Sequence, residues 1–399
     1  MPLNVVDTLC ELVSIPSVNP MGRDVTGEEF FEYAMTDHLE RLFERLGLPW
    51  LRQEVEPKRI NIMARLDGSQ PLDQGGQLLV FEAHQDTVPV DGMTIPPWTP
   101  EVRDGRVYGR GSCDIKGGMA CMLAAVARLA DERPEGRPTI VMACSVNEEH
   151  GYSGALKMGR LWETGETTLV PRAPDAVVVA EPTLLDVVVA HKGVVRWQCQ
   201  TGGRAAHSST PQLGDNAIYR MSRVLGALER YAVEVAPTLG QHPLVGAPTM
   251  SVGVIHGGIS VNTVPDQCTI EIDRRVLPQE SASTARQQVI DYLDEALQND
   301  PLVEHREAFI CSNGLDSVNN GQLAASLREV IQAQGAKGDL IGVPYGTDAT
   351  AFDLIGIPSV VFGPGSIQQA HTCDEWIAIE QLEAATEIYY QFGKRGLAG

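Results

Sequence analysis

The stretch IVMACSVNEEHGYSG, residues 140–154, passes from an apolar run to two adjacent carboxylates. Residues 140–146 have the length and composition of a covered strand, and two glycines then mark the start of a new element. Because successive side chains of a strand point to opposite sides, Glu148 and Glu149 are not expected to share one task. Taken alone, such a pair is more typical of the solvated first turn of a helix, where acidic side chains are favoured.

Strand and helix patterns alternate around this stretch, through the first half of the chain. Apolar strand patterns occupy residues 78–83 and 176–180, and the alanine-rich segment GGMACMLAAVARLADE predicts a helix at residues 117–132. Thr26 and Glu29 form a capping box, which predicts the start of an earlier helix. Such alternation is typical of an α/β domain with a mostly parallel sheet and helices on both faces.

The pattern changes after Glu181. Strands and helices then follow in the order β-α-β-β-α-β, which is the ferredoxin-like arrangement and can fold as a separate unit. We therefore predict one α/β catalytic domain, residues 1–191 and 310–399, interrupted by an inserted α+β lid and dimerisation domain, residues 192–309. The predicted elements of the second half are strands at 194–200, 250–255, 268–276 and 359–362, and helices at 216–232, 283–298, 322–334 and 381–392.

The composition is that of an ordinary soluble protein, with 399 residues, 43% of them hydrophobic and 21% charged. The formal net charge of -21 argues against a nucleic acid or an anionic membrane as the main partner. The N-terminal segment lacks the basic region and cleavage site of a signal peptide, and no apolar run has the length of a membrane span. The eight cysteines form no C-x-x-C pair, which suits a reducing compartment. We therefore expect a cytoplasmic protein.

Acidic and imidazole side chains stand at the ends of the predicted strands. The carboxyl ends of the strands form the functional rim of an open α/β sheet, so side chains placed there converge although they are far apart in the sequence. These side chains are His84 and Asp86 after the first strand, Glu148 and Glu149 after the next, Glu181 after the third, and His371 shortly after the strand at 359–362.

Two histidines and several carboxylates at one rim suit a pair of divalent metal ions. Two histidines, one shared aspartate and two glutamates make two sets of N and O ligands, which suit zinc, or else cobalt or manganese. Asp86 lies on the same side of its strand as His84, where it can hold the imidazole in one tautomer. Taken singly, each residue has an ordinary interpretation, such as a helix cap for Asp114 or a surface loop position for His371.

One glutamate is left over once the two metal sites are assembled. In a two-metal site a bridging carboxylate holds the ions roughly 3.5 to 4 Å apart, and a free carboxylate deprotonates the water between them. We therefore interpret Glu148 as the general base and Glu149 as a metal ligand.

Eight motifs in a fixed order make the chain resemble a known family. The motifs are HQDTVP, GRGSCDIKGG, NEEHGYSGA, AEPT, GRAAHSSTPQLGDNAI, GGISVNTVPDQ, DRR and GPGSIQQAHTCDEW. The chain is similar to the co-catalytic metallo-amidohydrolases, which include acetylornithine deacetylase, succinyl-diaminopimelate desuccinylase, aminoacylase and glutamate carboxypeptidase. The match runs over nearly the whole length, and although any one motif is weak, eight in order are specific.

This resemblance implies two divalent metal ions with a general base beside them. One carboxylate bridges both ions, and another carboxylate orients a histidine ligand. In this sequence the bridging residue is Asp114, the other ligands are His84 and Glu181 for one ion and Glu149 and His371 for the other, the base is Glu148, and the orienting residue is Asp86.

The resemblance also gives the inserted unit a task. His207 of AAHSS matches the lid histidine of the family, which reaches the active site of the partner subunit and stabilises the oxyanion. Asn262 and Arg275 match positions that hold the substrate carboxylate, a task that suits the planar fork of arginine. Gly363 is among the glycines that supply special backbone angles or a close approach of the substrate. Because a ferredoxin-like unit leaves sheet edges open, we expect a homodimer through the lid.

The expected reaction is hydrolysis of the amide bond of an N-acyl-L-amino acid. YGTDAT lacks the G-G-T-S-D-A-R pattern of desuccinylases, whereas GPGSIQQAH is similar to acetylornithine deacetylases. An acetylornithine deacetylase-like enzyme therefore ranks first, and a desuccinylase, dipeptidase or carboxypeptidase second. Two other classes of protein are disfavoured. An NAD-dependent dehydrogenase is disfavoured because GRGSCD lacks the third glycine of a dinucleotide-binding motif. A non-catalytic metal-binding protein is disfavoured because it is expected to have lost the base or a ligand, and none is missing here.

Overall fold

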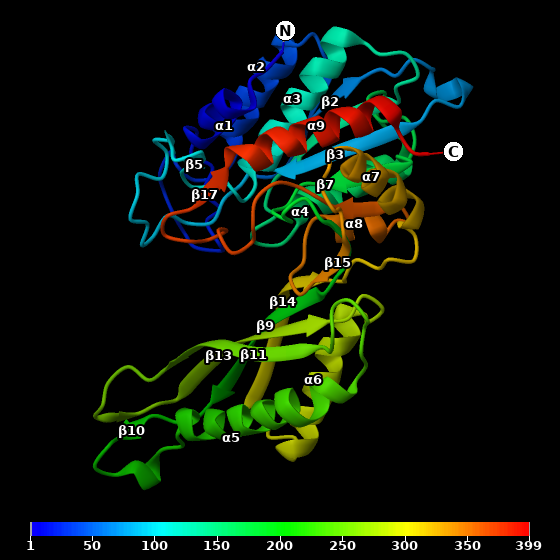
Figure 1. Cartoon of the computed structure of the whole chain (residues 1–399). Coiled ribbons are helices and arrows are strands. Elements are labelled where there is room, and N and C mark those ends of the chain that lie inside the picture. The colour runs from blue at the N-terminus through cyan, green and yellow to red at the C-terminus, as the bar shows by residue number, and fades with distance from the viewer. Residues whose placement is uncertain (1, 399) are drawn as a thin grey trace. The chain divides into compact units, whose positions relative to one another are not determined.

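The chain folds into two compact units, which a computed structural model describes for residues 2–398. The first unit takes the described residues up to Val189, then Asp316–Ile341, then the described residues from Thr347 onward. The second unit takes Ala190–Leu315 together with Gly342–Gly346. The second unit is thus an insertion, and Figure 1 shows the chain passing into it and returning to the first.

A large mixed sheet forms the centre of the first unit. In spatial order, its strands among the described residues are β1 (Trp50–Glu56), β2 (Arg59–Leu66), β6 (Thr139–Ser145), β3 (Leu78–His84), β7 (Ala176–Val179), β16 (Ser359–Val361), β8 (Val187–His191) and β15 (Leu340–Val343). β6, β3, β7 and β16 pair in parallel, whereas β1 and β2 are antiparallel. These parallel strands are buried along their whole length, which is why they read as continuous apolar runs.

Helices cover both faces of this sheet (Figure 1). On one face α3 and α9 pack together, with α1, α2 and α7 contributing to the same apolar core. On the other face α4 packs with α8, and Trp162 stacks on Phe352 with ring centroids 4.9 Å apart. The helices are α1 (Val5–Val13), α2 (Tyr33–Arg45), α3 (Lys116–Glu132), α4 (Ser153–Thr164), α7 (Gly321–Ala333), α8 (Ala349–Asp353) and α9 (Ile379–Arg395).

Helix α2 begins later than the sequence pattern predicts. It starts at Tyr33 without a side-chain cap, so the capping box of Thr26 with Glu29 is wrong. Turns and bends, with an isolated bridge between Val18 and Phe30, precede it: the N–H of Val18 donates to the carbonyl of Glu29 over 2.8 Å, and the N–H of Phe31 donates to the carbonyl of Val18 over 3.0 Å. Because these backbone groups are already paired, the helix cannot begin there.

A small antiparallel sheet belongs to the same unit. Its strands are β4 (Glu101–Arg103), β5 (Arg106–Tyr108) and β17 (Trp376–Ala378), and the register sets Trp376 opposite Tyr108. This pairing brings the segment that leads from β5 to α3 next to the segment that precedes β17.

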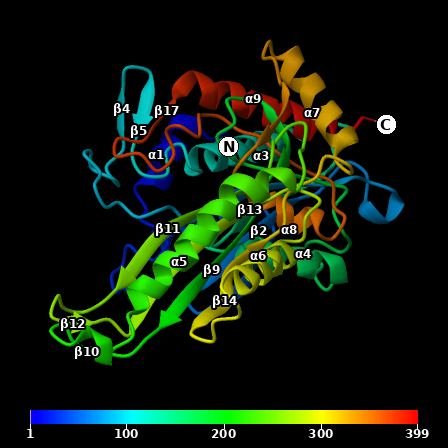
Figure 2. The same cartoon turned by 90° about the horizontal axis from the view of Figure 1, so that it is seen from below.

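The second unit is an antiparallel sheet with two helices on one face (Figure 2). Buried residues alternate with half-buried ones along β9 and β13, because one face of the sheet packs on these helices. In spatial order the strands are β11 (Thr249–Gly257), β13 (Gln267–Val276), β9 (Gly193–Gly202) and β14 (Val303–Ser312), and the helices are α5 (Ala217–Arg230) and α6 (Ala282–Ala296).

The two units confirm the predicted fold class, an α/β sheet domain interrupted by an α+β unit of β-α-β-β-α-β order. The boundaries predicted after residues 191 and 309, and the roles of the units as catalytic domain and lid, stay predictions. Within residues 2–398, no helix is both long enough and apolar enough to cross a membrane.

Candidate metal centre

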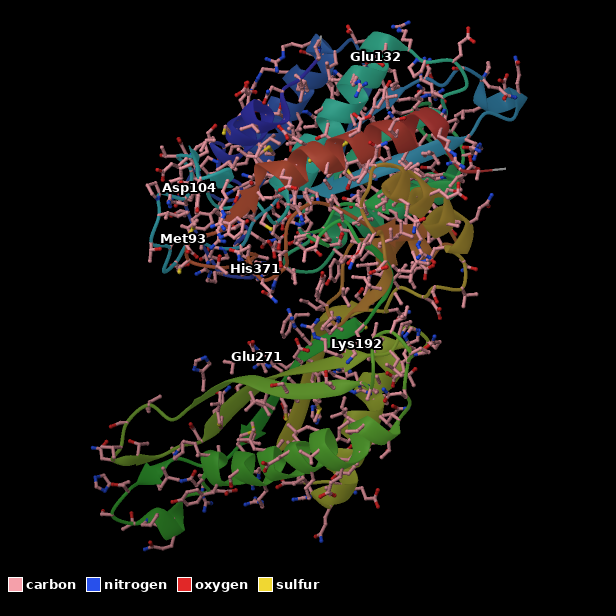
Figure 3. The ribbon with its side chains drawn as sticks, viewed as in Figure 1. Met93, Asp104, Glu132, Lys192, Glu271 and His371 are labelled. Atoms are coloured by element: carbon pink, nitrogen blue, oxygen red, sulfur yellow. The ribbon has the colours of Figure 1, made fainter. Side chains whose placement is uncertain are left out.

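The predicted metal ligands stand where neighbouring strands end. His84 is the last residue of β3, Glu149 follows β6 and Glu181 follows β7. Because β6 and β7 both pair with β3 in parallel, their carboxyl ends meet at one edge of the sheet. The other two ligands come from loops: Asp114 precedes α3, and His371 lies between β16 and β17, at the rim of the first unit (Figure 3).

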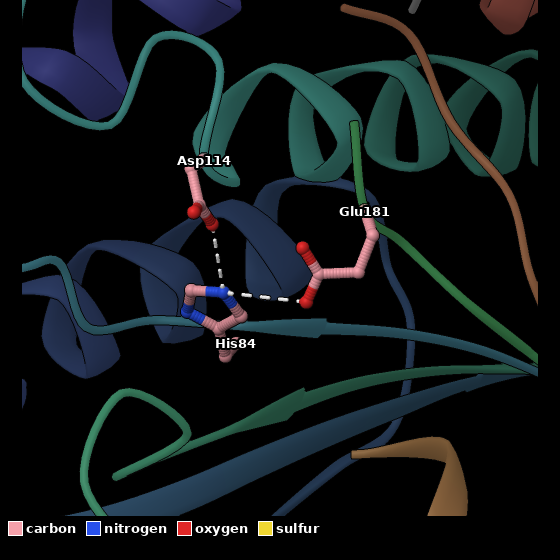
Figure 4. Close-up of side chains that lie close together, drawn as sticks. All are labelled: His84, Asp114 and Glu181. Atoms are coloured by element: carbon pink, nitrogen blue, oxygen red, sulfur yellow. Dashed lines mark ion pairs between the residues drawn. The ribbon is translucent and has the colours of Figure 1, made fainter. Parts of the chain in front are cut away.

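A first group of three side chains gathers at the end of β3 (Figure 4). The Nε2 atom of His84 lies 3.3 Å from an oxygen of Asp114 and 3.9 Å from an oxygen of Glu181. All three residues are buried, and their ligand atoms lie within 4.8 Å of one another. An imidazole and two carboxylates in this arrangement can hold one divalent cation.

A second group shares Asp114 with the first. The other carboxylate oxygen of Asp114 lies 3.3 Å from Nε2 of His371, and this nitrogen lies 3.2 Å from an oxygen of Glu149. One oxygen of Asp114 thus faces each group, which is the arrangement of a carboxylate that bridges two ions. The side chain of His371 is 53% exposed, so the second group is open to solvent on one side.

The buried carboxylates of this centre favour the binding of a cation. Burial, followed by repulsion from Asp114, raises the pKa of Glu149 to about 7 and that of Glu181 well above its usual range. Burial opposes ionisation of Asp114 as well, but the hydrogen bonds it accepts from His371 and His84 lower its pKa. Divalent ions at these positions would neutralise the carboxylates, and the donor set fits ions that take imidazole and carboxylate ligands.

Metal binding at this centre should release protons. In the metal-free protein, hydrogen bonds to Asp114 and Glu149 raise the pKa of His371 to about 10. This imidazole is then protonated near neutral pH, and a metal ion must displace its proton. At about pH 8 we expect the calorimetric enthalpy of zinc or cobalt binding to change with the ionisation enthalpy of the buffer, and the affinity to fall as the pH is lowered. Equal enthalpies in two non-precipitating buffers of different ionisation enthalpy would contradict this expectation.

Asp86 holds the turn that carries the two glutamates. Its carboxylate accepts the backbone N–H of Glu148 and that of Glu149, each over 3.1 Å, and the side-chain amide of Asn19 over 2.8 Å. The Nδ1 atom of His84 lies 3.0 Å from the backbone carbonyl of Asp86 and 3.6 Å from its carboxylate. The backbone carbonyl of Asp86 is thus within hydrogen-bond distance of the imidazole and its carboxylate fixes the turn, while the predicted part of the carboxylate in orienting His84 stays a prediction. Sequence reasoning missed the task of fixing the turn and the part of Asn19.

Glu148 lies in this turn but in neither ligand group that the described residues form. Burial comes first among the causes that raise its pKa well above the usual range; His84 opposes the shift, and Glu181 adds to it. A carboxylate with a raised pKa is a better proton acceptor than an exposed one, and it can return the proton within one turnover. This environment suits the predicted general base.

Two ordinary interpretations of the sequence are wrong. No side chain caps α3, whose N-cap residue is Ile115, so Asp114 does not serve as a helix cap. The side chain of Glu149 is only 6% exposed, and α4 does not begin until Ser153. The glutamates are therefore not the solvated entrance of a helix.

The structure brings His207 and Asn262 together in the second unit. His207 ends β10 (Ala206–His207), which pairs with β12 (Thr263–Val264), and the N–H of Ser208 donates to the carbonyl of Asn262 over 3.0 Å. His207 is exposed. Both residues thus belong to one end of this unit, and their parts in catalysis stay predictions.

Arg275 lies toward the other end of β13. Its guanidinium pairs with Asp273 over 2.7 Å. β13 begins at Gln267, next to β12, and eight residues of extended chain separate Gln267 from Arg275, which is about 27 Å. Within one copy of the unit, the structure therefore does not bring Arg275 beside Asn262.

Gly363 packs on the strand end that carries Glu181. A Cβ atom at Gly363 would lie 2.7 Å from the carbonyl oxygen of Glu181, so a side chain there would push the two segments apart. Its N–H donates to the hydroxyl of Thr183 over 3.1 Å. Close packing thus explains why a glycine stands at this position, and its part in substrate binding stays a prediction.

Asp348 of YGTDAT forms a buried acidic pair that sequence reasoning missed. It accepts the hydroxyl of Ser145 over 2.7 Å and contacts the buried Glu82 of β3. Burial raises the pKa of Asp348 to about 7 and that of Glu82 well above its usual range. The available signal was an acidic residue inside the apolar strand LLVFEAH. Because Asp348 is buried, this segment offers no open carboxylate to a substrate side chain.

Fold and site together define a metal-dependent hydrolase, with parallel strand ends that carry two ligand groups and a free carboxylate beside them. The sequence pattern described as "Peptidase family M20/M25/M40" matches residues 80–395. The chain belongs to this family, which confirms the resemblance and the predicted class of enzyme.

Curated relatives align with nearly the whole chain. Acetylornithine deacetylase of Photorhabdus laumondii is 31% identical over 97% of this chain and 95% of its own length. Acetylornithine deacetylase of Vibrio parahaemolyticus is 29% identical over 97% and 96%. A probable succinyl-diaminopimelate desuccinylase of Staphylococcus aureus is 26% identical over 90% and 91%. The relatives thus carry the names of both deacylases that the sequence suggested, a deacetylase and a desuccinylase.

Solved structures share the fold. An M20 family metallo-carboxypeptidase of Sulfolobus solfataricus superimposes with a TM-score of 0.77 at 18% identity, covering 98% of this chain and 99% of that one. A dinuclear metal-binding M20 peptidase of Bacillus subtilis superimposes with a TM-score of 0.68 at 16% identity, covering 98% and 97%. At this identity the likeness is one of fold.

Proposed function

We propose that the protein hydrolyses the amide bond of an N-acyl-L-amino acid, with N-acetyl-L-ornithine as the first candidate substrate. The observation that carries the proposal is the carboxylate of Glu148, which lies beside two complete ligand groups and belongs to neither. The relatives named acetylornithine deacetylase support acetyl as the acyl group of the substrate, because they align over 97% of the chain. Zinc as the ion and the cytoplasm as the location are part of the proposal.

Glu148 moves the proton in the proposed reaction. Held in the turn that Asp86 fixes, it takes a proton from the attacking water and gives it to the leaving amine. Bound divalent ions supply Lewis-acid polarisation of the carbonyl and lower the pKa of water. His207 donates a hydrogen bond to the oxyanion, and Asn262 and Arg275 hold the carboxylate of the substrate.

The second unit supports a homodimer in this proposal. Asn262 lies just before β12, near the start of β13, whereas Arg275 lies about 27 Å along β13 from its first residue, Gln267, and an N-acyl amino acid spans about 10 Å. One copy cannot bring both residues to one substrate. We therefore propose that Arg275 and Asn262 at one substrate come from different copies, and that His207 acts on the site of the partner. The exposed edge strand β11 offers a surface for two-fold pairing of identical edges.

N-acetyl-L-ornithine, or a related N-acetyl amino acid, should be cleaved with a higher kcat/KM than N-succinyl-diaminopimelate. The expected ratio is at least about tenfold, a difference of about 1.4 kcal/mol in transition-state stabilisation. Both compounds and a set of dipeptides are assayed with the metal-loaded protein, and the Glu148→Gln variant serves as the blank. A higher kcat/KM for the succinyl compound, or for a dipeptide, would reverse the ranking.

A further inference from the structure

Glu375 is buried beside the metal centre, and among the residues that the structure describes a single loop donates hydrogen bonds to its side chain. The side chain is 1% exposed and lies just before β17, in the segment that follows His371. Its contacts all come from the loop between β5 and α3, the loop that ends on Asp114. The resemblance of the chain to its family assigned no role to this residue.

Each oxygen of Glu375 has two partners. One oxygen accepts the backbone N–H of Cys113 over 2.9 Å and that of Asp114 over 3.0 Å. The other accepts the backbone N–H of Gly111 over 3.0 Å and a guanidinium N–H of Arg110 over 2.7 Å. Three backbone groups and one charge therefore converge on one carboxylate, which fixes the path of the loop.

The backbone reinforces this connection. The N–H of Gly109 donates to the carbonyl of Glu375 over 3.1 Å, and the pairing of Tyr108 with Trp376 continues the contact into β5 and β17. The Sγ atom of Cys113 lies 3.4 Å from the carbonyl of Ser366, in the segment that follows β16. The loop of Asp114 is thus bound on two sides to the segment that carries His371.

We infer that Glu375 is a positioning residue for the metal centre, which holds the loop of the bridging Asp114 in register with the loop of His371. Asp114 belongs to both ligand groups, so a shift of its loop changes both sites together. This inference rests on the ligand set proposed above. Partners that orient metal ligands in this way are worth about 10- to 100-fold in metal affinity.

Glu375→Gln tests the inference with a small change of shape. Glutamine has one acceptor oxygen where glutamate has two, and its amide group is a donor that faces donors. Two of the four contacts are therefore lost, and both of their donors then face an amide that is itself a donor. The matched control is Asp374→Asn, which makes the same chemical change one residue away, at an exposed position in the same segment.

The experiment is a titration of the metal-free protein with Co²⁺ alone, in which binding is monitored by the visible absorption of the bound ion. We expect both binding steps to weaken about 10- to 100-fold in Glu375→Gln and neither to change in Asp374→Asn. Excess metal should restore kcat, with KM unchanged, because the residue acts on the ions and not on the substrate. Thermal unfolding of both metal-free variants checks that they are folded.

Glu149→Ala separates this inference from the ligand set on which it rests. Loss of one Co²⁺ site in Glu149→Ala with wild-type affinity in Glu375→Gln would overturn the role of Glu375 and leave the ligands standing. Unchanged binding in both variants would overturn both. If Glu375→Gln does not fold, Arg110→Lys, which keeps the charge but loses the fork, should weaken Co²⁺ binding in the same direction, and wild-type affinity there would overturn the inference.

Discussion

Glu148→Gln should bind metal like the wild type and turn over N-acetyl amino acids about 10²- to 10⁴-fold more slowly. The loss is large because an amide cannot take a proton from water, whereas both ligand groups stay complete without this side chain. The kcat at saturating metal and the metal content after dialysis, measured by elemental analysis, check the two halves of this expectation.

Glu149→Ala is the control for this result, because it changes the neighbouring carboxylate in the same turn. It should lower the occupancy of one ion, since Glu149 contacts His371 in the second ligand group. Near-normal turnover in Glu148→Gln would rule out its role as the base. Full occupancy in Glu149→Ala, together with metal loss in Glu148→Gln, would mean that the two roles are reversed.

Mixing two inactive proteins, His207→Ala and Glu148→Gln, should restore activity once subunits exchange. Each variant alone should be slower by about 10²-fold or more, through loss of an oxyanion donor or of the base. In a hybrid dimer, one site receives an intact base from one copy and an intact histidine from the other. With random exchange about half of the dimers are hybrids, so the mixture should reach about a quarter of wild-type activity.

Size-exclusion chromatography and differently tagged subunits establish that hybrids have formed. A mixture that stays inactive although hybrids are present would rule out the action of His207 across an interface. Full activity in a protein that stays monomeric at assay concentration would rule out the homodimer itself.

The parallel core could be predicted from the sequence because burial on both faces leaves a continuous apolar run. Residues 78–84 and 139–145 form neighbouring buried strands, and polar side chains follow each apolar run at its carboxyl end. Since parallel strands of one sheet end at the same edge, His84 and Glu149 could be placed together without knowledge of the strand order. The ligand groups could therefore be predicted from the apolar runs of the buried strands and from the common edge at which parallel strands end.

Other features depend on contacts that no local pattern reveals. The capping box at Thr26 failed because a distant residue, Val18, pairs with the segment and competes with the helix. The part of Asp86 in fixing the glutamate turn requires the register between β3 and β6. Glu375 reads as an ordinary acidic residue before a strand, and its four partners become visible only when the strands β5 and β17 are paired.

The place of β16 in the sheet determines the order in which the protein can be completed during synthesis. β16 lies between β7 and β8, yet it begins at Ser359, long after β8 ends at His191. At common rates of translation this interval lasts roughly 10–30 s, during which β7 and β8 lack their shared partner and expose unpaired backbone groups. The segment from β16 to β17 then fills the gap in the sheet and carries His371. A nascent chain that stalls before this segment has a split sheet and lacks His371 of the second ligand group, and its unpaired strand edges are open to aggregation and to proteases.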